Sequence, residues 1–418
     1  FPWIPPPGSA PITDFGASPT KSAVDNQAAI QAALDTLPPL KSVGIPPGIF
    51  RTGPLVVSKS KTWITGPGEA AVLKAEPSMY IPNQSVGGST LRTIGGLTEV
   101  VMMDFALDGA GTDTCFGITV RDGTDAIVQR VTAYEWFGVL SQRARGLNVQ
   151  RNGPSSAGPF RNVSFLNCVT RRCQIGYVMH WSNTHIAGCI AQDAPMDGYY
   201  IDGLEGRTTL VGNTAIRCNR AGFNLIVGWF NTLRQNRAEA CATGIQIYDS
   251  RGNLVEKNIV VDGTISEGIT LRANAIENVL RENIVIGQRG GGEGIFVFQP
   301  GTRDNLVEGN ECYLNLRNGI FSNGAGPNIF RRNVSFNNGK GGGVYGGIAF
   351  RDSSGNVIGG AAGDGNRCYD DQPVKTQAYG VITSGTSTNN VITFNDLRGN
   401  RDGAFLLVGS NEVHDNLT

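Results

Sequence analysis

The chain has 418 residues, with 35 basic and 35 acidic side chains, so its formal net charge is zero. A chain without net charge gives no reason to expect binding to nucleic acid or to a membrane surface. No run of apolar residues is long enough to span a bilayer. We therefore expect a soluble protein whose partners are neither nucleic acid nor membrane.

Residues 1–40 are expected to form an N-terminal extension that ends in a helix. The chain begins FPWIPPPG, with neither an initiator Met nor a targeting segment, which suggests that a leader has been removed and that the protein is secreted. Residues 25–37 carry an apolar stripe typical of an amphipathic helix, and such a helix would cover the open first coil of a solenoid. The stripe consists of Ala28, Ala29, Ile30, Ala32, Ala33 and Leu34.

From residue 41 to residue 418 the chain is expected to be one solenoid. A six-residue motif, Asn followed by four residues and a second Asn, returns about every two dozen positions. It reads NVSFLN at 162–167, NLVEKN at 253–258 and NVLREN at 278–283, and five further copies have the same spacing. A period of that length, with apolar residues alternating inside it, is typical of stacked supersecondary units.

A Gly opens a short strand 8 to 11 residues after most of the closing Asn positions. Examples are GYVMHW at 176, GYYIDG at 198 and GIQIYD at 244, and GVLSQR at 138 is assigned to the same pattern. The first and third residues after the Gly are mostly apolar, whereas the second and fourth are mixed, which indicates a strand with one buried face. No intervening segment is long and periodic enough for a helix, so each repeat is predicted to be one all-β coil of a parallel β-helix.

The repeated Asn residues are expected to be structural. Asn tolerates the positive φ that a tight corner needs, and Asn side chains on successive coils can stack as a ladder of hydrogen bonds. Cys168 and Cys189 fall close to the ladder position, where a buried Cys acts as a small apolar filler. Cys218 and Cys241 occupy similar places on neighbouring coils, from which a disulfide could form, and one or two disulfides are expected in the chain.

Function is expected on the outward face of the Gly-opened strands, where equivalent positions of adjacent coils lie about 4.8 Å apart. The outward positions are the second and fourth after each Gly, which includes Leu140 and Gln142 in the coil of GVLSQR. His180 and Asp202 both take the fourth position on consecutive coils, so they are expected to be neighbours. A His beside a carboxylate is a candidate acid–base pair.

The same lane and the segments just beyond it carry groups that can bind a sugar. Aromatic rings bind the C–H faces of sugars, and amides and charged groups bind the hydroxyls. The candidates for binding are Trp181, Glu205, Asn224, Trp229, Gln246, Tyr248 and Arg272, and Tyr200 joins His180 and Asp202 as a catalytic candidate. The predicted partner is therefore a polysaccharide or oligosaccharide.

Several segments resemble a known superfamily. ITDFGA at 12–17, the helical pattern at 25–37, VGIPPGIF at 43–50 and TWITGPGEAAVLKA at 62–75 look like the opening of the pectate-lyase-type right-handed parallel β-helix superfamily. It includes polygalacturonases, pectate and alginate lyases, mannuronan C-5 epimerases and phage tailspikes. The resemblance implies an all-β, single-stranded right-handed parallel β-helix over 41–418, with residues 1–40 as extension and capping helix.

The central coils GYVMHW, GYYIDGLE, AGFNLIV and GIQIYD look most like those of the mannuronan C-5 epimerases. In that family a group of Tyr, His and Asp removes and returns the proton beside a uronate carboxylate, which implies catalytic roles for Tyr200, His180 and Asp202. Met179 precedes His180 where the family has Asp and Pro, and the motifs of polygalacturonases are absent. The reaction therefore stays open.

Three functions remain in view. The first is β-elimination or epimerisation of a polyuronide, with Tyr200 and His180 moving protons and Arg272 neutralising the carboxylate; zero net charge weakens it, because few cations besides Arg121 and Arg272 line the lane. The second is a glycosidase or transglycosidase that uses two carboxylates, and the third is a non-catalytic carbohydrate-binding fibre. The carboxylate candidates are Asp202 with Glu205, Asp197 or Asp249.

No cofactor and no metal ligand set is expected from the sequence. Calcium is common in the superfamily that the chain resembles, and Asp193, Asp197 and Asp202 are close enough in sequence to invite it. No loop of regularly spaced oxygen ligands accompanies them.

Overall fold

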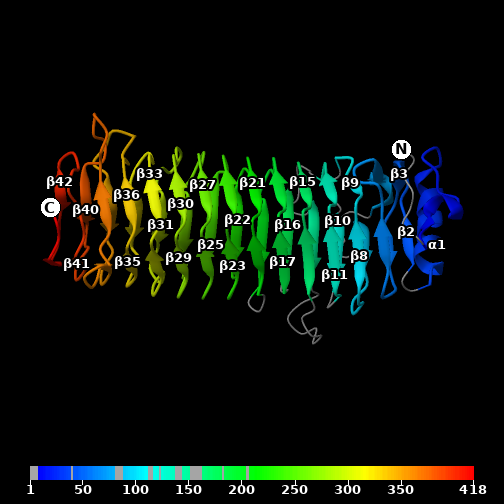
Figure 1. Ribbon diagram of the computed structural model, residues 1–418, viewed down its shortest axis with the longest axis horizontal. Coiled ribbons are helices and arrows are strands. Elements are labelled where there is room, and N and C mark those ends of the chain that lie inside the picture. The colour runs from blue at the N-terminus through cyan, green and yellow to red at the C-terminus, as the bar shows by residue number, and fades with distance from the viewer. Residues whose placement is uncertain are drawn as a thin grey trace. The chain divides into compact units, whose positions relative to one another are not determined.

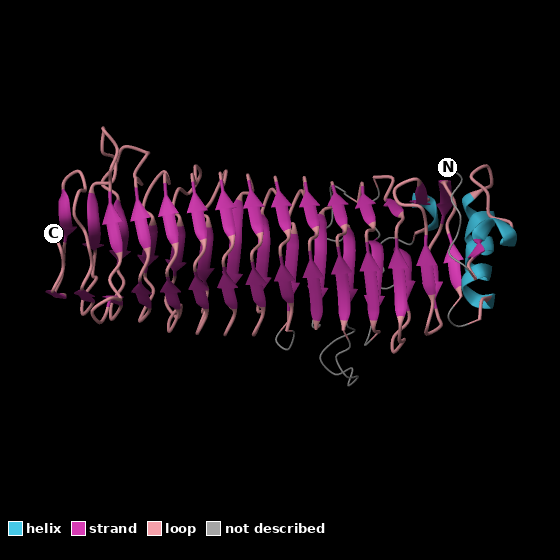
Figure 2. Cartoon of the chain, viewed as in Figure 1, coloured by secondary structure: helices cyan, strands magenta, loops and turns pink. Residues whose placement is uncertain are grey.

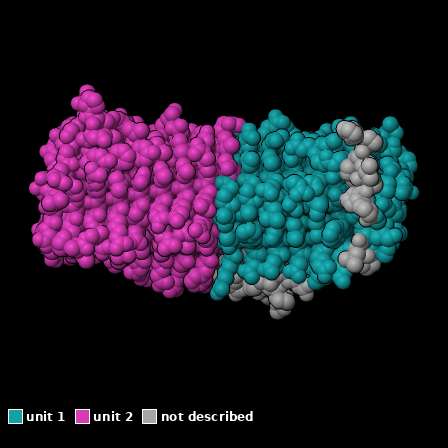
Figure 3. Space-filling view, in the orientation of Figure 1, with its two compact units in different colours: residues 1–213 teal, residues 214–418 magenta. Residues whose placement is uncertain are grey.

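The computed structural model describes residues 8–38, 41–80, 88–111, 116–121, 124–136, 144–150, 162–180, 183–203 and 207–418. The chain divides into two compact units, residues 1–213 and 214–418 (Figure 3). Each unit is a stack of coils made of short parallel strands, and a helix lies near the N-terminus (Figures 1 and 2). The predicted all-β, right-handed parallel β-helix with an N-terminal helix is confirmed. Among the described residues, no helix is long and apolar enough to cross a membrane.

In unit 1, successive strands of the chain join three parallel sheets in turn. Sheet 1 contains β1 (Ala10–Pro11), β2 (Ser42–Gly44), β5 (Trp63–Thr65), β8 (Val100–Met103), β11 (Ala126–Gln129), β14 (Val163–Leu166), β17 (Thr184–Ala187) and β20 (Thr209–Val211). Sheet 2 contains β3 (Gly48–Thr52), β6 (Ala71–Ala75), β9 (Ala106–Asp108), β12 (Thr132–Tyr134), β15 (Val169–Arg171) and β18 (Ile190–Gln192). Sheet 3 contains β4 (Leu55–Val57), β7 (Ser89–Thr93), β10 (Phe116–Arg121), β13 (Arg145–Gln150), β16 (Ile175–His180) and β19 (Tyr199–Asp202).

Unit 2 repeats this arrangement with more regular coils. Its sheet 1 contains β23 (Thr232–Arg234), β26 (Leu254–Glu256), β29 (Val279–Arg281), β32 (Leu306–Glu308), β35 (Ile329–Arg331), β38 (Val357–Gly359), β41 (Val391–Thr393) and β43 (Glu412–His414). Its sheet 2 contains β21 (Thr214–Ile216), β24 (Arg237–Glu239), β27 (Ile259–Val261), β30 (Ile284–Ile286), β33 (Glu311–Tyr313), β36 (Val334–Phe336) and β39 (Arg367–Tyr369). Its sheet 3 contains β22 (Ala221–Ile226), β25 (Thr243–Tyr248), β28 (Ile269–Arg272), β31 (Ile295–Phe298), β34 (Ile320–Asn323), β37 (Gly346–Arg351), β40 (Tyr379–Ser384) and β42 (Gly403–Leu406).

The helix α1 (Ala23–Thr36) covers the first coil as predicted, together with the short 3-10 turns η1 (Ile12–Phe15) and η2 (Pro77–Met79) in the N-terminal region. Ser22 caps the helix, because its hydroxyl accepts a hydrogen bond from the backbone of Asp25 at 3.2 Å. The side chain of Gln31 bonds both the N–H and the C=O of Val56 in β4, each at 2.9 Å. The amide of Gln31 thus provides hydrogen-bond partners for backbone groups at the free edge of β4, the first strand of sheet 3.

The buried stripe of α1 differs from the predicted one. The buried residues are Ala23, Asn26, Ala29, Ile30, Ala33 and Leu34. Ala28 is exposed and Ala32 half-buried, because buried positions on a helix recur every three or four residues and these two fall outside that spacing.

The predicted Asn ladders run through unit 2. Asn283 is fully buried, and its backbone N–H and its side-chain Nδ2 both donate to Oδ1 of Asn310 on the next coil. Its own Oδ1 accepts the same pair of bonds from Asn258 on the preceding coil. The positive φ predicted for the motif Asn is found at Asn167 of NVSFLN, but in the ladder of unit 2 the prediction is wrong, because the positive φ falls on the residue before the ladder Asn, such as Lys257 and Glu282.

Cysteines take ladder positions instead of forming disulfides. The backbone N–H of Cys168 donates to Sγ of Cys189 at 3.3 Å, and that of Cys218 donates to Sγ of Cys241 at 3.5 Å. All seven cysteines among the described residues are free and buried. The filler role of Cys168 and Cys189 is confirmed. Cys218 and Cys241 form no disulfide, because Sγ of Cys241 accepts a bond from the backbone of Cys218 instead, and none of the one or two expected disulfides is found among the described residues.

The outward side chains on sheet 1 of unit 2 alternate in charge. Arg234, Glu256, Arg281, Glu308 and Arg331 occupy equivalent positions on five consecutive strands. Glu256 pairs with an arginine on each side, at 3.2 Å and 2.7 Å, and Glu308 pairs with Arg331 at 3.0 Å. We call this row the charge column.

A buried carboxylate in unit 2 gives the fold a pH dependence. Glu293 is 4% exposed and accepts a hydrogen bond from the backbone N–H of Asn318 at 2.8 Å. Burial raises the pKa of Glu293 from 4.5 to about 7, although the bond from Asn318 opposes the shift. Because the native carboxyl keeps its proton where the unfolded chain has lost it, native stability falls as pH rises from about 4.5 to about 7 and then stays level.

The variant Glu293→Gln is expected to be more stable than the parent at pH 8, by up to about 3 kcal/mol, and equally stable at pH 4. The amide keeps an acceptor for Asn318 but carries no charge that burial could disfavour. Urea unfolding at both pH values measures this difference. Glu311→Gln, at an exposed position of β33, is the control, and an equal effect of pH on parent and variant would contradict the prediction.

Candidate functional site

The candidate site lies on sheet 3 of unit 1, where β16 pairs with β19 in parallel. Val178 lies beside Tyr200 and His180 beside Asp202 in the register of these strands. Nδ1 of His180 is 3.5 Å from Oδ2 of Asp202, and their side chains are 17% and 31% exposed. The predicted proximity of His180 and Asp202 is therefore confirmed.

Arg145 holds the other side of the His180 ring. Its Nη1 lies 2.9 Å from Nε2 of His180. A guanidinium can only donate, so Nε2 is the acceptor of this bond. In the neutral ring the proton then resides on Nδ1 and faces the carboxylate of Asp202. The three side chains thus form a row in which both ring nitrogens have a partner.

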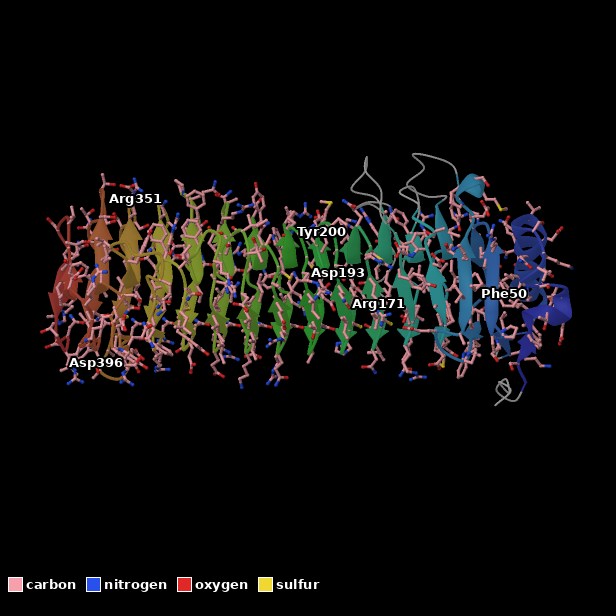
Figure 4. All side chains as sticks on the ribbon, turned by 90° about the horizontal axis from the view of Figure 1, so that it is seen from above. Phe50, Arg171, Asp193, Tyr200, Arg351 and Asp396 are labelled. Carbon is pink, nitrogen blue, oxygen red and sulfur yellow. The ribbon has the colours of Figure 1, made fainter. Side chains whose placement is uncertain are left out.

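Tyr200 approaches the same ring from β19. Its ring centroid lies 6.0 Å from that of His180, with the planes at 68°. Tyr200 is half-buried and is labelled in Figure 4. A phenol hydroxyl can donate or accept a proton, so this cluster contains two groups that can take part in proton transfer and one carboxylate that orients them.

The sequence interpretation missed Arg145 because it assigned the strand of this coil to GVLSQR. Residues 138–143, with the predicted outward positions Leu140 and Gln142, lie outside the described residues. The strand of sheet 3 that the structure describes here is β13, which has its Gly at 146. RGLNVQ follows the same alternation as the other Gly-opened strands and was the signal that could have found it.

Arg145 is one of three arginines on sheet 3 of unit 1. Arg92 pairs in register with Thr119, and Arg121 holds the end of the same strand β10. Burial, with a smaller effect of the neighbouring Arg121, lowers the pKa of Arg92. Arg145 also lies over the ring of Phe116, with its guanidinium carbon 5.3 Å from the centroid. This face of unit 1 is more basic than the sequence interpretation expected.

The remaining described candidates lie in unit 2. Asn224 is fully buried, and its Oδ1 accepts a hydrogen bond from Gln246 at 3.0 Å. The guanidinium of Arg272 lies over the ring of Tyr248, 5.4 Å from its centroid, and Tyr248 is 37% exposed. Trp229 is half-buried beyond the end of β22, where it pairs with Arg251.

The outward lane is less open than predicted. Thr119, Asn148, Val178, Asn224 and Thr270 are at second positions after a Gly, and each is at most 3% exposed. Several fourth positions are more open, because His180, Asp202 and Arg272 are half-buried there and reach the surface.

The other predicted site residues lie apart from His180 and Asp202 or outside the described part of the chain. Trp181 and Glu205 lie outside the described residues. Of the carboxylates proposed as partners of Asp202, Asp197 is fully buried and Asp249 belongs to unit 2. Within the parts of the chain that the structure describes, no three His, Cys, Asp or Glu side chains are grouped so as to hold a metal ion, and this includes the aspartates considered for calcium.

Comparison with known proteins supports the fold. No curated protein matches the chain in sequence. A family model described as periplasmic copper-binding protein (NosD) matches residues 148–289, about a third of the chain.

Several solved structures are similar to this chain. The gene product 12 of bacteriophage phi29, in its pre-mature form, matches with a TM-score of 0.63 at 12% identity, over 92% of this chain and 64% of that chain. The Dettilon tailspike protein (gp208) matches with a TM-score of 0.59 at 13% identity, over 89% and 70%. The A-module of the Azotobacter vinelandii mannuronan C-5 epimerase AlgE6 matches with a TM-score of 0.44 at 19% identity, over 97% and 98%. Likeness at such low identity concerns the fold and not the reaction.

Proposed function

We propose that this protein is a carbohydrate-active enzyme that moves a proton beside the carboxylate of an acidic polysaccharide, by lyase or epimerase chemistry. The observation that carries the proposal is the row of Arg145, His180 and Asp202 with Tyr200 against the imidazole. A positioned acid–base group beside a cation is what removal of a proton next to a carboxylate requires.

Asp202 orients His180 and selects its tautomer. With the proton on Nδ1 facing Asp202, the lone pair of Nε2 is the basic one. A carboxylate in this place also stabilises the imidazolium that forms once Nε2 has taken a proton. His180 is therefore the group that accepts the proton, and Asp202 is a positioning residue.

Arg145 has several acceptors within reach, because its Nη1 also donates to Oδ1 of Asn148 at 3.4 Å and a bound substrate would add a carboxylate. In the structure it donates to Nε2 of His180, which occupies the basic lone pair. A hydrogen bond from a guanidinium to a carboxylate is stronger than one to a neutral acceptor. A uronate carboxylate at this face therefore draws Arg145 away, frees Nε2, and has its own charge offset while the neighbouring C–H loses its proton.

The two reactions differ in which atom receives the proton of Tyr200. In β-elimination, Nε2 takes the C5 proton, a C4–C5 double bond forms, the bond from C4 to the glycosidic oxygen breaks, and Tyr200 gives its proton to that oxygen. In epimerisation the C4–O bond stays intact, and Tyr200 delivers a proton to C5 from the opposite face. In both cases the two groups must exchange protons with water before the next turnover.

We place the activity outside the cytoplasm, with a polysaccharide as partner. What supports this is the match of residues 148–289 to a family described as periplasmic and the half-buried, polar outward positions of sheet 3. No step of the proposed reaction requires a cofactor.

The test is a panel of acidic polysaccharides, with alginate and polygalacturonate as probes and a neutral β-glucan beside them. Elimination gives an unsaturated product that absorbs in the ultraviolet, epimerisation changes the C5 configuration seen by NMR, and hydrolysis raises reducing ends without absorbance. New reducing ends alone would favour the glycosidase alternative, and binding without any product would favour a carbohydrate-binding fibre.

Arg145→Ala is expected to lower kcat/KM on the acidic polymer by about tenfold or more, which is the scale of one hydrogen bond to a charged group. Arg145→Lys should recover part of this loss, because it keeps the charge but not the forked donors. Arg171→Ala, on sheet 2 of unit 1 with a side chain 48% exposed, is the matched control. Activity of Arg145→Ala equal to that of the control would remove Arg145 from the mechanism.

A further inference from the structure

The outward positions on sheet 3 of unit 2 change character between β28 and β34. Arg272 lies next to Phe298 in the register of β28 and β31, and Thr270 lies next to Phe296. Phe296 lies next to Phe321 of β34. The three preceding strands carry Asn224, Gln246 and Thr270 at this register position, whereas β31 and β34 carry Phe there.

Arg272 carries a charge that the protein does not neutralise. Among the described residues it makes no ion pair, and its contact is with the ring of Tyr248 at 5.4 Å. Its Nε is buried without an acceptor. By contrast, Arg351 occupies an equivalent position on β37 and lies 3.7 Å from Asp352. The guanidinium is half-buried and reaches the surface, so an anionic ligand would supply the counter-charge and a charge-assisted hydrogen bond.

The three phenyl rings form an ordered stack. Phe298 and Phe296 have centroids 5.0 Å apart at 17°, and Phe296 and Phe321 have centroids 5.3 Å apart at 7°. All three are half-buried although they point outward. Three aromatic side chains grouped in this way form an apolar surface that is suited to the C–H groups of a sugar.

We infer that Arg272, Tyr248 and the stacked phenyl rings form a non-catalytic subsite for one uronate residue of the polysaccharide. A uronate is the sugar that presents both required features, a carboxylate for Arg272 and an apolar ring face for the phenyl groups. The inference rests on the proposed function. It adds to that function a means by which unit 2 favours acidic over neutral sugars.

The experiment measures binding and turnover separately, on the full chain. Isothermal titration of the non-reacting His180→Ala protein uses oligogalacturonate and oligomannuronate as anionic probes and cello-oligosaccharide as the neutral one. Adding Arg272→Gln is expected to weaken binding of the anionic probes about tenfold, which is the scale of one charged hydrogen bond, and to leave the neutral probe unchanged. Adding Phe296→Leu, which keeps an apolar side chain but removes the ring, should weaken both.

The matched control is Arg351→Gln, which should bind like the parent. In the otherwise unmodified enzyme, Arg272→Gln should raise KM and leave kcat within about twofold, since the subsite touches no reacting atom. Anionic binding that is unchanged by Arg272→Gln would overturn the subsite even if the enzyme is active. If anionic probes bind in a way that depends on Arg272 but the parent protein shows no turnover, the subsite is supported and the proposed reaction is rejected.

Discussion

Replacement of His180 by Ala, or of Asp202 by Asn, is expected to lower turnover about a hundredfold or more, which is the scale of losing a positioned proton-transfer group. The first change removes the lone pair that Arg145 covers in the structure, and the second removes the charge that faces Nδ1. Turnover at saturating substrate is the measurement. The double variant should be little worse than either single one, because groups that act as a unit are not additive.

Both changes should leave the fold intact. His180 and Asp202 are half-buried on the outward face, so the free energy of unfolding should change by under about 1 kcal/mol. Arg351→Ala, whose side chain is 64% exposed and which is labelled in Figure 4, is the control. Near-normal turnover in both single variants would place the chemistry elsewhere, with the sequence candidates Glu205 and Asp249 next.

Replacement of Asn283 by Leu is expected to destabilise the protein by about 3 kcal/mol or more, because each buried group left without a partner costs roughly 1–3 kcal/mol. The substitution leaves the backbone N–H of Asn258 without its side-chain acceptor, removes one of the two acceptors of its Nδ2, and leaves the carbonyl of Val255 without its donor at 2.9 Å. All three groups lie inside the stack, where water cannot replace the lost bonds. Thermal or urea unfolding measures the loss.

Asn416→Leu provides the comparison within the same ladder. Asn416 also accepts two bonds from Asn395, but it has no following ladder Asn and is half-buried in the last described coil. Water can reach the groups that this change exposes, so its effect should be much smaller. Equal melting temperatures for the two variants would mean that the ladder does not contribute as the contacts suggest.

The proximity of His180 and Asp202 could be predicted because each stands four residues after a Gly. In a solenoid, residues at the same distance from the Gly of successive repeats lie side by side on neighbouring strands, so their contact follows from the repeat alone. Arg145 could not be found in this way, because it precedes its Gly and reaches His180 through a long side chain. The strand that carries it was also misassigned, since GVLSQR at 138 and RGLNVQ at 145 offer the same alternation.

The positions of the ladder Asn residues were predicted correctly, but positive φ is not the reason that Asn is needed there. Asn was expected at the corner because it tolerates positive φ, yet Lys257 and Glu282 take that conformation just before the ladder residues Asn258 and Asn283. The side chain of Asn is needed to bond the coils above and below. Burial at second positions such as Asn224 was likewise unpredictable, since it depends on the size of neighbours in other coils.

The charge column has a consequence for how this chain could have grown. The Asn ladder would tolerate insertion of one additional coil, because every ladder Asn forms the same bonds with the Asn of the next coil. The charge column would not, because Arg234, Glu256, Arg281, Glu308 and Arg331 alternate strictly. Duplication of the single coil that carries Glu256 would set two glutamates side by side, and like charges directly opposite are destabilising. Duplication of two coils preserves the alternation, so gene duplication in this region is expected to add coils in pairs.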